Sequence, residues 1–237
     1  MAAVEDALAA IDSVEGWLTR EQATRLWQRA AELAPPGRVV DIGSYRGRSA
    51  IVLAMGAPPG VDVVAIDPHG GNDRGPREIE GTTEEGERDN AVFRANLERA
   101  GAADRVRHMR LPSQDALAEL PGEIDLLYVD GAHRYGPARD DLSRWGARVR
   151  PGGRMLVHDS FSSIGVTLAI ARLLLAGREF RYDGRTGSLA EYTRGPLTGA
   201  ARLRNALRQA AELPWFARNV AIKLLIVLRL RSGDWPY

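Results

Sequence analysis

The chain has 237 residues, 44% of them hydrophobic and 27% charged, and its 32 basic and 31 acidic side chains leave a formal net charge of +1. This composition is that of an ordinary globular protein, and the balanced charge argues against nucleic acid as a partner. Cysteine is absent, which excludes disulfides and thiolate chemistry and favours a reducing, cytoplasmic location. Lys223 is the only lysine, a coding bias typical of GC-rich genomes such as those of actinobacteria.

Helical and strand patterns alternate along the chain. Leu, Ala and Trp at helical spacing predict an N-terminal helical cap over residues 1–36, with Ser13 and Thr19 as candidate N-caps. Short apolar runs predict strands at 38–43, 61–67, 106–111, 124–129 and 154–158. Helices are predicted between them at 49–55, 91–100, 114–120 and 136–149. This alternation indicates an α/β protein with a doubly wound, mostly parallel, Rossmann-like sheet over residues 37–193.

Two segments differ from this pattern. Residues 69–90 contain almost no apolar side chains and predict a long mobile loop, which either closes over a substrate as a lid or is disordered. Residues 194–237 hold eight Arg or Lys against two acids and predict a basic amphipathic helical tail. Such a helix can lie on a membrane surface. Packing against the core or against a second subunit is the favoured interpretation, and a homo-oligomer such as a dimer is expected.

A glycine-containing turn follows the first predicted strand, in the sequence Asp41-Ile-Gly43-Ser-Tyr-Arg-Gly47. In an open parallel sheet, ligands bind at the carboxyl ends of the strands beside this turn, and glycine leaves room for a ligand against the backbone. Asp67 ends the second strand, 24 positions after Gly43, where a carboxylate can accept hydrogen bonds from both hydroxyls of a ribose. Because dinucleotide sites require G-x-G-x-x-G and this turn is G-x-x-x-G, a cofactor without phosphates fits it better.

These residues resemble a known pattern. The segment 39–49 resembles motif I of the class I S-adenosylmethionine-dependent methyltransferases, 65–67 the acidic end of their second strand, and 150–153 the turn before their fifth strand. Ser113-Gln114-Asp115 falls where such enzymes hold the adenine. The resemblance covers about residues 13–160 and implies S-adenosylmethionine as the cofactor. It implies a cofactor site formed by Asp41, Gly43, Ser44, Gly47, Ser49, Asp67, Ser113, Gln114 and Asp130.

Acidic residues and histidines follow the fourth and fifth predicted strands, in Asp130-Gly-Ala-His133 and His158-Asp159. Asp130 and Asp159 both lie at carboxyl ends of strands, and two carboxylates that converge there suit a hard divalent cation such as Mg²⁺. Such an ion can bind adjacent hydroxyls of an acceptor and lower the pKa of the attacking one. His133, three residues past Asp130, is the candidate general base because imidazole titrates near neutrality.

The D-x-x-H pattern resembles that of the macrocin- and mycinamicin-type sugar O-methyltransferases and, more distantly, that of the catechol O-methyltransferases. The resemblance implies that Asp130 and Asp159 are metal ligands and that His133 is the base. It also implies an acceptor that is a sugar, in a polysaccharide or a glycosylated natural product, or another polyhydroxylated small molecule. The sugar enzymes have an acid at the position of His158. Imidazole is a poorer ligand for Mg²⁺, so His158 as a third ligand would favour Mn²⁺, and a site of two carboxylates is the alternative.

Other interpretations stay open at this point. Asp130 and Asp159 could each cap the following helix, His158 could be a buried imidazole that points away from the site, and His133 could be a solvated loop residue. A nicotinamide-dependent oxidoreductase, disfavoured by the glycine spacing, and a membrane-peripheral scaffold without chemistry are the competing functions. Hydroxylases share the sheet and the D-x-x-H pattern, so the fold does not fix the reaction.

Overall fold

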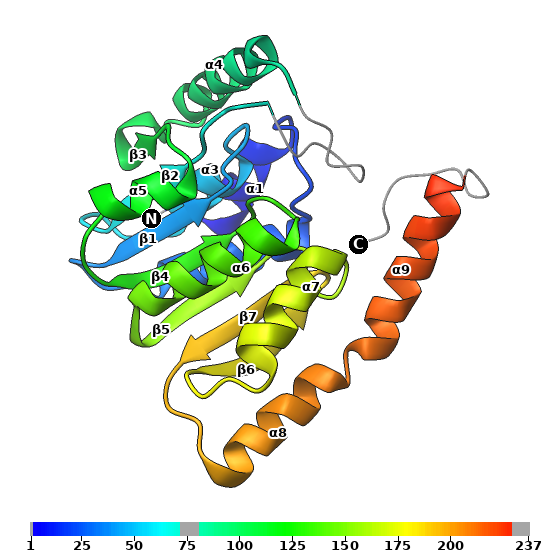
Figure 1. The fold of residues 1–237 in the computed structure, drawn as a ribbon. Coiled ribbons are helices and arrows are strands. Elements are labelled where there is room, and N and C mark those ends of the chain that lie inside the picture. The colour runs from blue at the N-terminus through cyan, green and yellow to red at the C-terminus, as the bar shows by residue number, and fades with distance from the viewer. Residues whose placement is uncertain (1, 72–80, 229–237) are drawn as a thin grey trace.

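The computed structural model describes residues 2–71 and 81–228, and its centre is a sheet with helices on both faces (Figure 1). Within the described residues, seven strands pair in the order β3-β2-β1-β4-β5-β7-β6. The strands from β1 to β5 pair in parallel, whereas β7 runs antiparallel to both of its neighbours. The predicted α/β class with a doubly wound, mostly parallel sheet is confirmed.

The strands are β1 (Arg38–Ile42), β2 (Asp62–Ile66), β3 (Val106–Met109), β4 (Ile124–Val129), β5 (Val149–Val157), β6 (Phe180–Thr186) and β7 (Leu189–Arg194). The helices are α1 (Val4–Ile11), α2 (Arg20–Ala31), α3 (Arg48–Gly56), α4 (Thr83–Arg99), α5 (Ser113–Glu119), α6 (Tyr135–Arg144), α7 (Ile164–Ile170), α8 (Gly199–Ala210) and α9 (Leu213–Val227). Short helical turns occur at Ala103–Arg105, Gly146–Arg148 and Ala171–Leu175. All five predicted strands are present, although β5 begins earlier than expected.

Two hydrophobic cores lie on opposite faces of the sheet because side chains alternate along each strand. On β1, Val39 belongs to the core under α1, α2 and α3, while its neighbour Val40 belongs to the core under α5, α6 and α7. Trp145, directly after α6, is the largest fully buried side chain of the second core. Parallel strands that are buried on both faces must be apolar throughout, which is why the runs in β1, β2 and β4 are recognisable in the sequence.

The antiparallel edge of the sheet was not predicted. Strands β6 and β7 form a hairpin around Gly187, whose φ is 57°, and Tyr182 of β6 pairs with Tyr192 of β7. β6 contains only two large apolar side chains, Phe180 and Tyr182, and the outermost strand of a sheet has only one neighbour. Such a strand has no continuous apolar run and therefore gives a weaker sequence signal than a buried parallel strand.

Helix α4 corrects the predicted loop over residues 69–90. It begins at Thr83, and Thr82 caps it: the Thr82 hydroxyl accepts a hydrogen bond from the Glu85 amide at 3.2 Å, and the Glu85 carboxylate accepts one from the Thr82 amide at 2.8 Å. This reciprocal capping box starts a helix even in a polar sequence. The predicted loop is therefore wrong for residues 83–90, and residues 72–80 lie outside the described residues.

The N-terminal helices are part of the same packed unit as the sheet. Thr19 caps α2 as predicted, with its hydroxyl accepting a hydrogen bond from the Gln22 amide at 3.3 Å. The other candidate cap, Ser13, lies in the turn after α1. The Gln22 side chain donates to the Ser188 hydroxyl at 3.0 Å, so α2 contacts the turn between β6 and β7.

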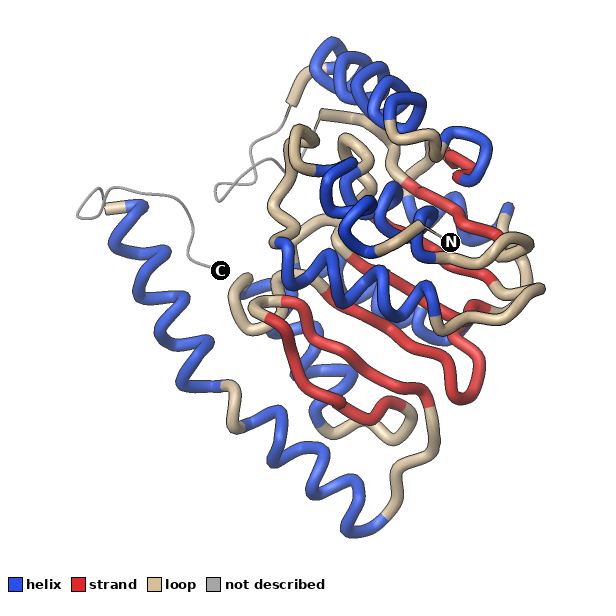
Figure 2. Tube along the Cα trace, turned by 180° about the vertical axis from the view of Figure 1, so that it is seen from behind, coloured by secondary structure: helices blue, strands red, loops and turns tan. Residues whose placement is uncertain are grey.

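Helices α8 and α9 lie at the edge of the molecule beyond β6 in both views (Figures 1 and 2). The predicted helical tail is therefore present as two helices as far as residue 228. Asn205 of α8 binds the backbone of β6, since its Oδ1 accepts from the Tyr182 amide at 2.7 Å and its Nδ2 donates to the Phe180 carbonyl at 3.1 Å. Among residues 2–71 and 81–228, no helix combines the length and the apolar character that crossing a membrane requires.

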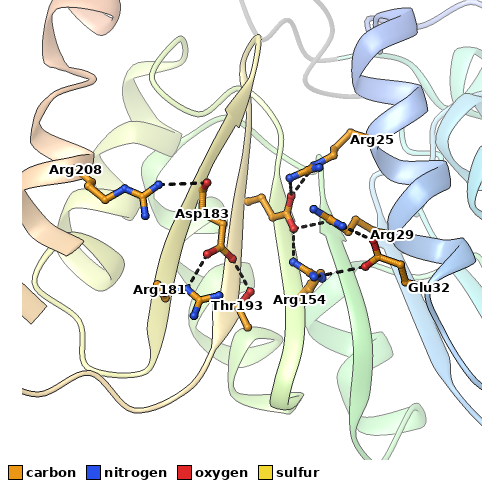
Figure 3. A network of polar contacts seen from close by, with 9 residues as sticks. Arg25, Arg29, Glu32, Arg154, Arg181, Asp183, Thr193 and Arg208 are labelled. Carbon is orange, nitrogen blue, oxygen red and sulfur yellow. Dashed lines mark hydrogen bonds and ion pairs between the residues drawn. The ribbon is translucent and has the colours of Figure 1, made fainter. Parts of the chain in front are cut away.

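Glu191 of β7 is a buried carboxylate that binds arginines. Figure 3 labels three of these arginines, Arg25, Arg29 and Arg154, which come together at one place. The Glu191 oxygens lie 2.6 Å from Arg25, 2.7 Å from Arg29 and 2.6 Å from Arg154. Arg25 and Arg29 belong to α2, and Arg154 belongs to β5. Charge-assisted hydrogen bonds of this kind are stronger than neutral ones, so one acid joins the N-terminal helices to the antiparallel edge of the sheet.

We expect Glu191→Gln to lower the free energy of unfolding by about 2–3 kcal/mol, because it removes the negative charge and leaves three guanidinium groups around a buried site. Asp183→Asn is the matched control. Asp183 also binds an arginine, Arg181, but that arginine is exposed, so the loss is expected to stay below about 1 kcal/mol. Urea unfolding followed by circular dichroism measures both variants, and equal losses would contradict the role given to Glu191.

Candidate active site

A cavity of about 320 Å³ opens at the carboxyl ends of β1, β2 and β4. This is the position at which ligands bind in open parallel sheets, and the volume is that of a small-molecule pocket. Among the residues expected at the site from the sequence, those that line this cavity are Gly43, Asp67, Ser113, Gln114, Asp130 and His133. Residues from four separate segments of the chain thus meet around one space.

Gly43 allows the turn after β1 to lie directly against the end of β4. Its φ is 86°, and a Cβ at this position would lie 2.1 Å from the carbonyl oxygen of Asp130. Any side chain here would therefore displace the turn from the strand. Gly47 has a φ of 91° and stands at the N-cap of α3, so it shapes the end of the turn without lining the main cavity.

Ser44 and Ser49 face a second, smaller cavity on the other side of the turn, which the N-terminal segment covers with Trp17. Trp17 and Asp130 line both cavities, so the two spaces adjoin. The Ser44 hydroxyl is buried and has no hydrogen-bond partner among the described residues. Because buried polar groups are nearly always paired, this hydroxyl indicates a place for a polar ligand group.

Asp67 holds the rim of the main cavity through two backbone amides. Its Oδ2 accepts a hydrogen bond from the Tyr45 amide at 2.8 Å, and its Oδ1 accepts one from the His69 amide at 2.7 Å. An ionised carboxylate offers about four acceptor positions. Asp67 can therefore bind two ligand hydroxyls while it keeps both backbone contacts.

Asp41 is fully buried beneath the turn rather than in the lining of the main cavity. The Ser49 hydroxyl donates to Asp41 Oδ2 at 2.8 Å, and Oδ1 has no hydrogen-bond partner within the described chain. Burial raises the pKa of Asp41 to about 8. The Asp41 carboxyl group is therefore mainly protonated at neutral pH, and its hydrogen bond holds the Ser49 hydroxyl in place.

The far wall of the main cavity is fixed by α6. The Ser113 hydroxyl, at the start of α5, donates to Asp141 Oδ1 at 2.5 Å, and the Trp145 indole nitrogen donates to the Ser113 carbonyl at 3.2 Å. Burial raises the pKa of Asp141 to about 6. Gln114 lines the same wall, so Asp141 adds a carboxyl acceptor beside the Ser113–Gln114 pair.

Asp130, His133 and Asp159 form a cluster at the rim, and one ligand atom of each lies within 4.8 Å of the others. His133 Nε2 lies 2.8 Å from Asp159 Oδ2, and the Tyr128 hydroxyl donates to Asp130 Oδ2 at 2.9 Å. Asp159 has a φ of 54°, a backbone conformation that is uncommon outside glycine and that occurs often at functional sites. Asp130 and His133 line the main cavity, and the buried Asp159 lies against His133.

His158 lies beneath this cluster and is buried. Its Nδ1 lies 3.1 Å from Asp130 Oδ1, and its Nε2 lies 3.3 Å from Gln22 Oε1. The Gln22 oxygen also accepts a hydrogen bond from the Thr19 amide at 2.9 Å, which identifies this atom as an acceptor. The His158 imidazole therefore lies between two acceptors, Asp130 Oδ1 and Gln22 Oε1, and each of its ring nitrogens is placed to carry a proton. Only Nδ1 faces the rim cluster, so a metal ion could reach His158 through that atom alone.

The charges of the rim cluster stabilise one another. Burial alone would lower the pKa of His158, but Asp130 and Asp159 raise it well above the ordinary imidazole value. Burial would also lower the pKa of His133, which Asp159 raises in the same way. For Asp159 burial acts in the opposite direction, and the two histidines hold its pKa well below the usual range. The Asp159 carboxylate therefore stays ionised at neutral pH.

Asp89 lines the main cavity from α4, and the sequence analysis missed it. It is buried, and it accepts a hydrogen bond from Arg46 Nε at 2.9 Å. The capping box of Thr82 and Glu85 was the available signal, because it starts a helix that runs through residue 89.

The site and the sheet together define the class of protein. A parallel sheet with an antiparallel β7, a glycine turn after β1 and an acid after β2 are the features of a class I S-adenosylmethionine-dependent methyltransferase fold. Residues 40–160 match a family model described as a methyltransferase domain, and the chain belongs to this family.

Similar proteins agree with this assignment. A protein from Mycobacterium tuberculosis named catechol O-methyltransferase is 33% identical over 133 residues, which are 56% of this chain and 51% of that protein. The chain therefore spans about half the length of this curated relative. The solved structure of cofactor-bound Rv0187 from MTB is 26% identical with a TM-score of 0.55, and the match covers 81% of this chain and 88% of that one.

A further solved structure is similar in fold. The O-methyltransferase TomG from Streptomyces achromogenes, in complex with S-adenosylmethionine, is 18% identical with a TM-score of 0.51. The match covers 84% of this chain and 91% of that one. The likeness extends beyond the segment matched by the family model, so the arrangement of the whole sheet is shared.

We expect the wild-type protein to lose stability relative to Asp41→Asn as the pH rises from about 5 to about 8. Between the unfolded pKa near 4 and the folded pKa of about 8, the folded state binds one proton more than the unfolded state. Its free energy of unfolding therefore falls with increasing pH, whereas the asparagine variant has no such group. Urea unfolding of both proteins across this range measures the difference, and a constant difference would show that Asp41 is ionised in the folded state.

Proposed function

We propose that the chain is an S-adenosylmethionine-dependent O-methyltransferase whose acceptor is a sugar or another small molecule with adjacent hydroxyl groups. The observation that carries the proposal is the pairing of His133 with Asp159 at the rim of the cavity that Asp67 borders. The relative named catechol O-methyltransferase supports this reaction type, since catechols and sugars both present neighbouring hydroxyl oxygens. The comparisons give no support to a nicotinamide-dependent oxidoreductase or to a scaffold without chemistry.

The two adjoining cavities suit S-adenosylmethionine, which supplies a methyl group from its sulfonium sulfur when bound. Gly43 adds no side-chain atoms to the lining of the main cavity. The Asp67 carboxylate has acceptor positions left for the ribose hydroxyls. Ser113 and Gln114 line the wall that we assign to the adenine. The Ser44 hydroxyl, which has no hydrogen-bond partner within residues 2–71 and 81–228, suits the polar amino-acid end of the cofactor. The absence of cysteine agrees with an enzyme of the reducing cytoplasm.

His133 acts as the general base in this proposal. Asp159 lies against Nε2 and holds a proton on that atom, so the neutral imidazole keeps Nδ1 as its proton acceptor. The acceptor hydroxyl oxygen forms a bond to the methyl carbon as the bond from that carbon to sulfur breaks, and the hydroxyl proton passes to His133. Asp159 stabilises the imidazolium that results.

The rim cluster also fits a divalent cation, because its ligand atoms lie within 4.8 Å of one another and two of its three members are carboxylates. We assign Asp130 and Asp159 as ligands of Mg²⁺ or Mn²⁺. When bound, the ion would lower the pKa of an acceptor hydroxyl that it contacts. His158 would join as a third ligand only after losing the proton on Nδ1, which faces Asp130.

Two substitutions distinguish the role of general base from the role of metal ligand. We expect His133→Asn to retain Mn²⁺ binding but to reduce methyl transfer by about 100- to 10,000-fold, which is the usual contribution of a general base. Asp130→Asn is expected to weaken Mn²⁺ binding, because a carboxylate ligand is lost. Electron paramagnetic resonance measures the bound Mn²⁺, and transfer of radiolabelled methyl groups to a panel of sugars and catechols measures activity.

Binding of S-adenosylhomocysteine is the control for His133→Asn, since this change removes neither Asp67 nor Gly43, whereas Asp130 lines both cavities and its replacement is expected to affect cofactor binding as well. Treatment with EDTA should abolish transfer, and added Mg²⁺ or Mn²⁺ should restore it. Loss of Mn²⁺ from His133→Asn would instead make His133 a ligand. Full activity in EDTA would rule out metal assistance.

A further inference from the structure

Helices α8 and α9 present apolar side chains to the outside of the molecule. On α8, Leu203 and Leu207 lie one turn apart and are 63% and 61% exposed. We use the term leucine face for the exposed leucines of the two helices and the residue after them, which are Leu203, Leu207, Leu213, Leu224, Leu225 and Leu228. Figures 1 and 2 place both helices at the edge of the molecule. Six exposed leucines on two consecutive helices indicate an interaction surface.

Buried polar side chains fix the rotation of both helices. Besides the contacts of Asn205 with β6, Gln209 Nε2 donates to the Leu174 carbonyl at 3.2 Å, and Gln209 Oε1 accepts from the Tyr192 hydroxyl at 3.3 Å. On α9, Asn219 Nδ2 donates to the Phe161 carbonyl at 3.1 Å. On α8 the amide side chains thus face the body of the protein while Leu203 and Leu207 face outward, which is the reverse of a helix that packs on a core in water. On α9, Ile222 is buried and Trp215 and Phe216 pack against the core, while Leu213, Leu224 and Leu225 stay exposed.

The charge on this part of the chain is positive. Arg204 and Arg208 each directly follow a leucine of the leucine face, and both are exposed, although the Arg208 guanidinium also donates to the Asp183 carbonyl at 3.4 Å. Between residues 195 and 228 the only acid is Glu212. Its carboxylate accepts hydrogen bonds from Arg185 at 2.8 Å and from the Tyr182 hydroxyl at 2.9 Å, so it is directed to the body of the protein. The outward surface therefore combines leucine with arginine.

We propose that α8 and α9 dock the protein on the surface of an anionic lipid bilayer. Leucines at the boundary of the acyl chains and arginines at the phosphates are the combination that holds interfacial helices. A second copy of the chain is a poorer occupant, because a symmetric contact would bring Arg204 and Arg208 of both copies into one interface. Anionic headgroups neutralise the same charges. The proposal does not depend on the methyl-transfer reaction.

Co-sedimentation with lipid vesicles tests the proposal on the full chain. We expect binding to vesicles of phosphatidylglycerol and phosphatidylcholine in equal parts, little binding to phosphatidylcholine alone, and weaker binding at high salt. The double variant Leu203→Ser/Leu207→Ser should bind at least about tenfold more weakly, because it removes two large apolar side chains from the contact. These leucines are exposed, so the fold is not at risk, and circular dichroism checks it.

A charge-matched pair of variants isolates the arginine contribution. Arg204→Glu should weaken binding to the anionic vesicles by about tenfold or more, whereas Arg144→Glu, an equal change at an exposed position on α6, should leave it unchanged. The proposal is overturned if the wild type does not bind anionic vesicles, or if the leucine variant binds as well as the wild type. It is also overturned if sedimentation equilibrium shows a dimer that the leucine variant dissociates, since a second copy would then cover the leucine face.

Discussion

Where β1 ends, its backbone is held from both sides by the neighbouring strands. The Gly43 amide donates to the Ile66 carbonyl of β2 at 2.9 Å, and the Asp130 amide donates to the Ile42 carbonyl at 2.8 Å. These bonds bring the turn so close to β4 that only glycine fits at position 43. Asp67 directly follows β2 and Asp130 directly follows β4, and both line the main cavity. The geometry of the site thus results from the register of three parallel strands.

The N-terminal helices belong to the site as well as to the fold. Gln22 of α2 contacts His158 beneath the rim, and His158 in turn faces Asp130. The same helix reaches the antiparallel edge through the arginines around Glu191. Because Asp130 and Asp159 raise the pKa of the buried His158 well above the ordinary imidazole value, its positive charge balances the carboxylates of the rim cluster. A metal ion bound at the rim cluster would compete with the positively charged His158 for the Asp130 carboxylate.

Elements of the fold and of the site could be predicted from the sequence where a single physical requirement determines the local residues. Strands β1, β2 and β4 are buried on both faces and had to be apolar, and Gly43 and Asp67 follow from the needs of a ligand at the strand ends. Contacts between distant residues could not be read in this way. Gln22 and His158 are 136 positions apart, and nothing local to either indicates the partner. Helix α4 was recoverable from its capping box, whereas the polar outer strand β6 offered no comparable signal. The tail was expected to be amphipathic, but the side that faces the protein is shown only by contacts with distant residues, such as those of Asn205, Gln209 and Asn219.

Calorimetric titration with S-adenosylhomocysteine, with NAD as the comparison ligand, tests the central claim that Asp67 and the β1 turn form a nucleoside site. The account predicts that S-adenosylhomocysteine binds, that NAD does not, and that Asp67→Asn weakens binding by about 10- to 100-fold through loss of charge-assisted hydrogen bonds. Asp62→Asn, at the other end of β2, should bind as the wild type does. Equal affinity of the wild type and Asp67→Asn, or no binding of S-adenosylhomocysteine, would contradict the account.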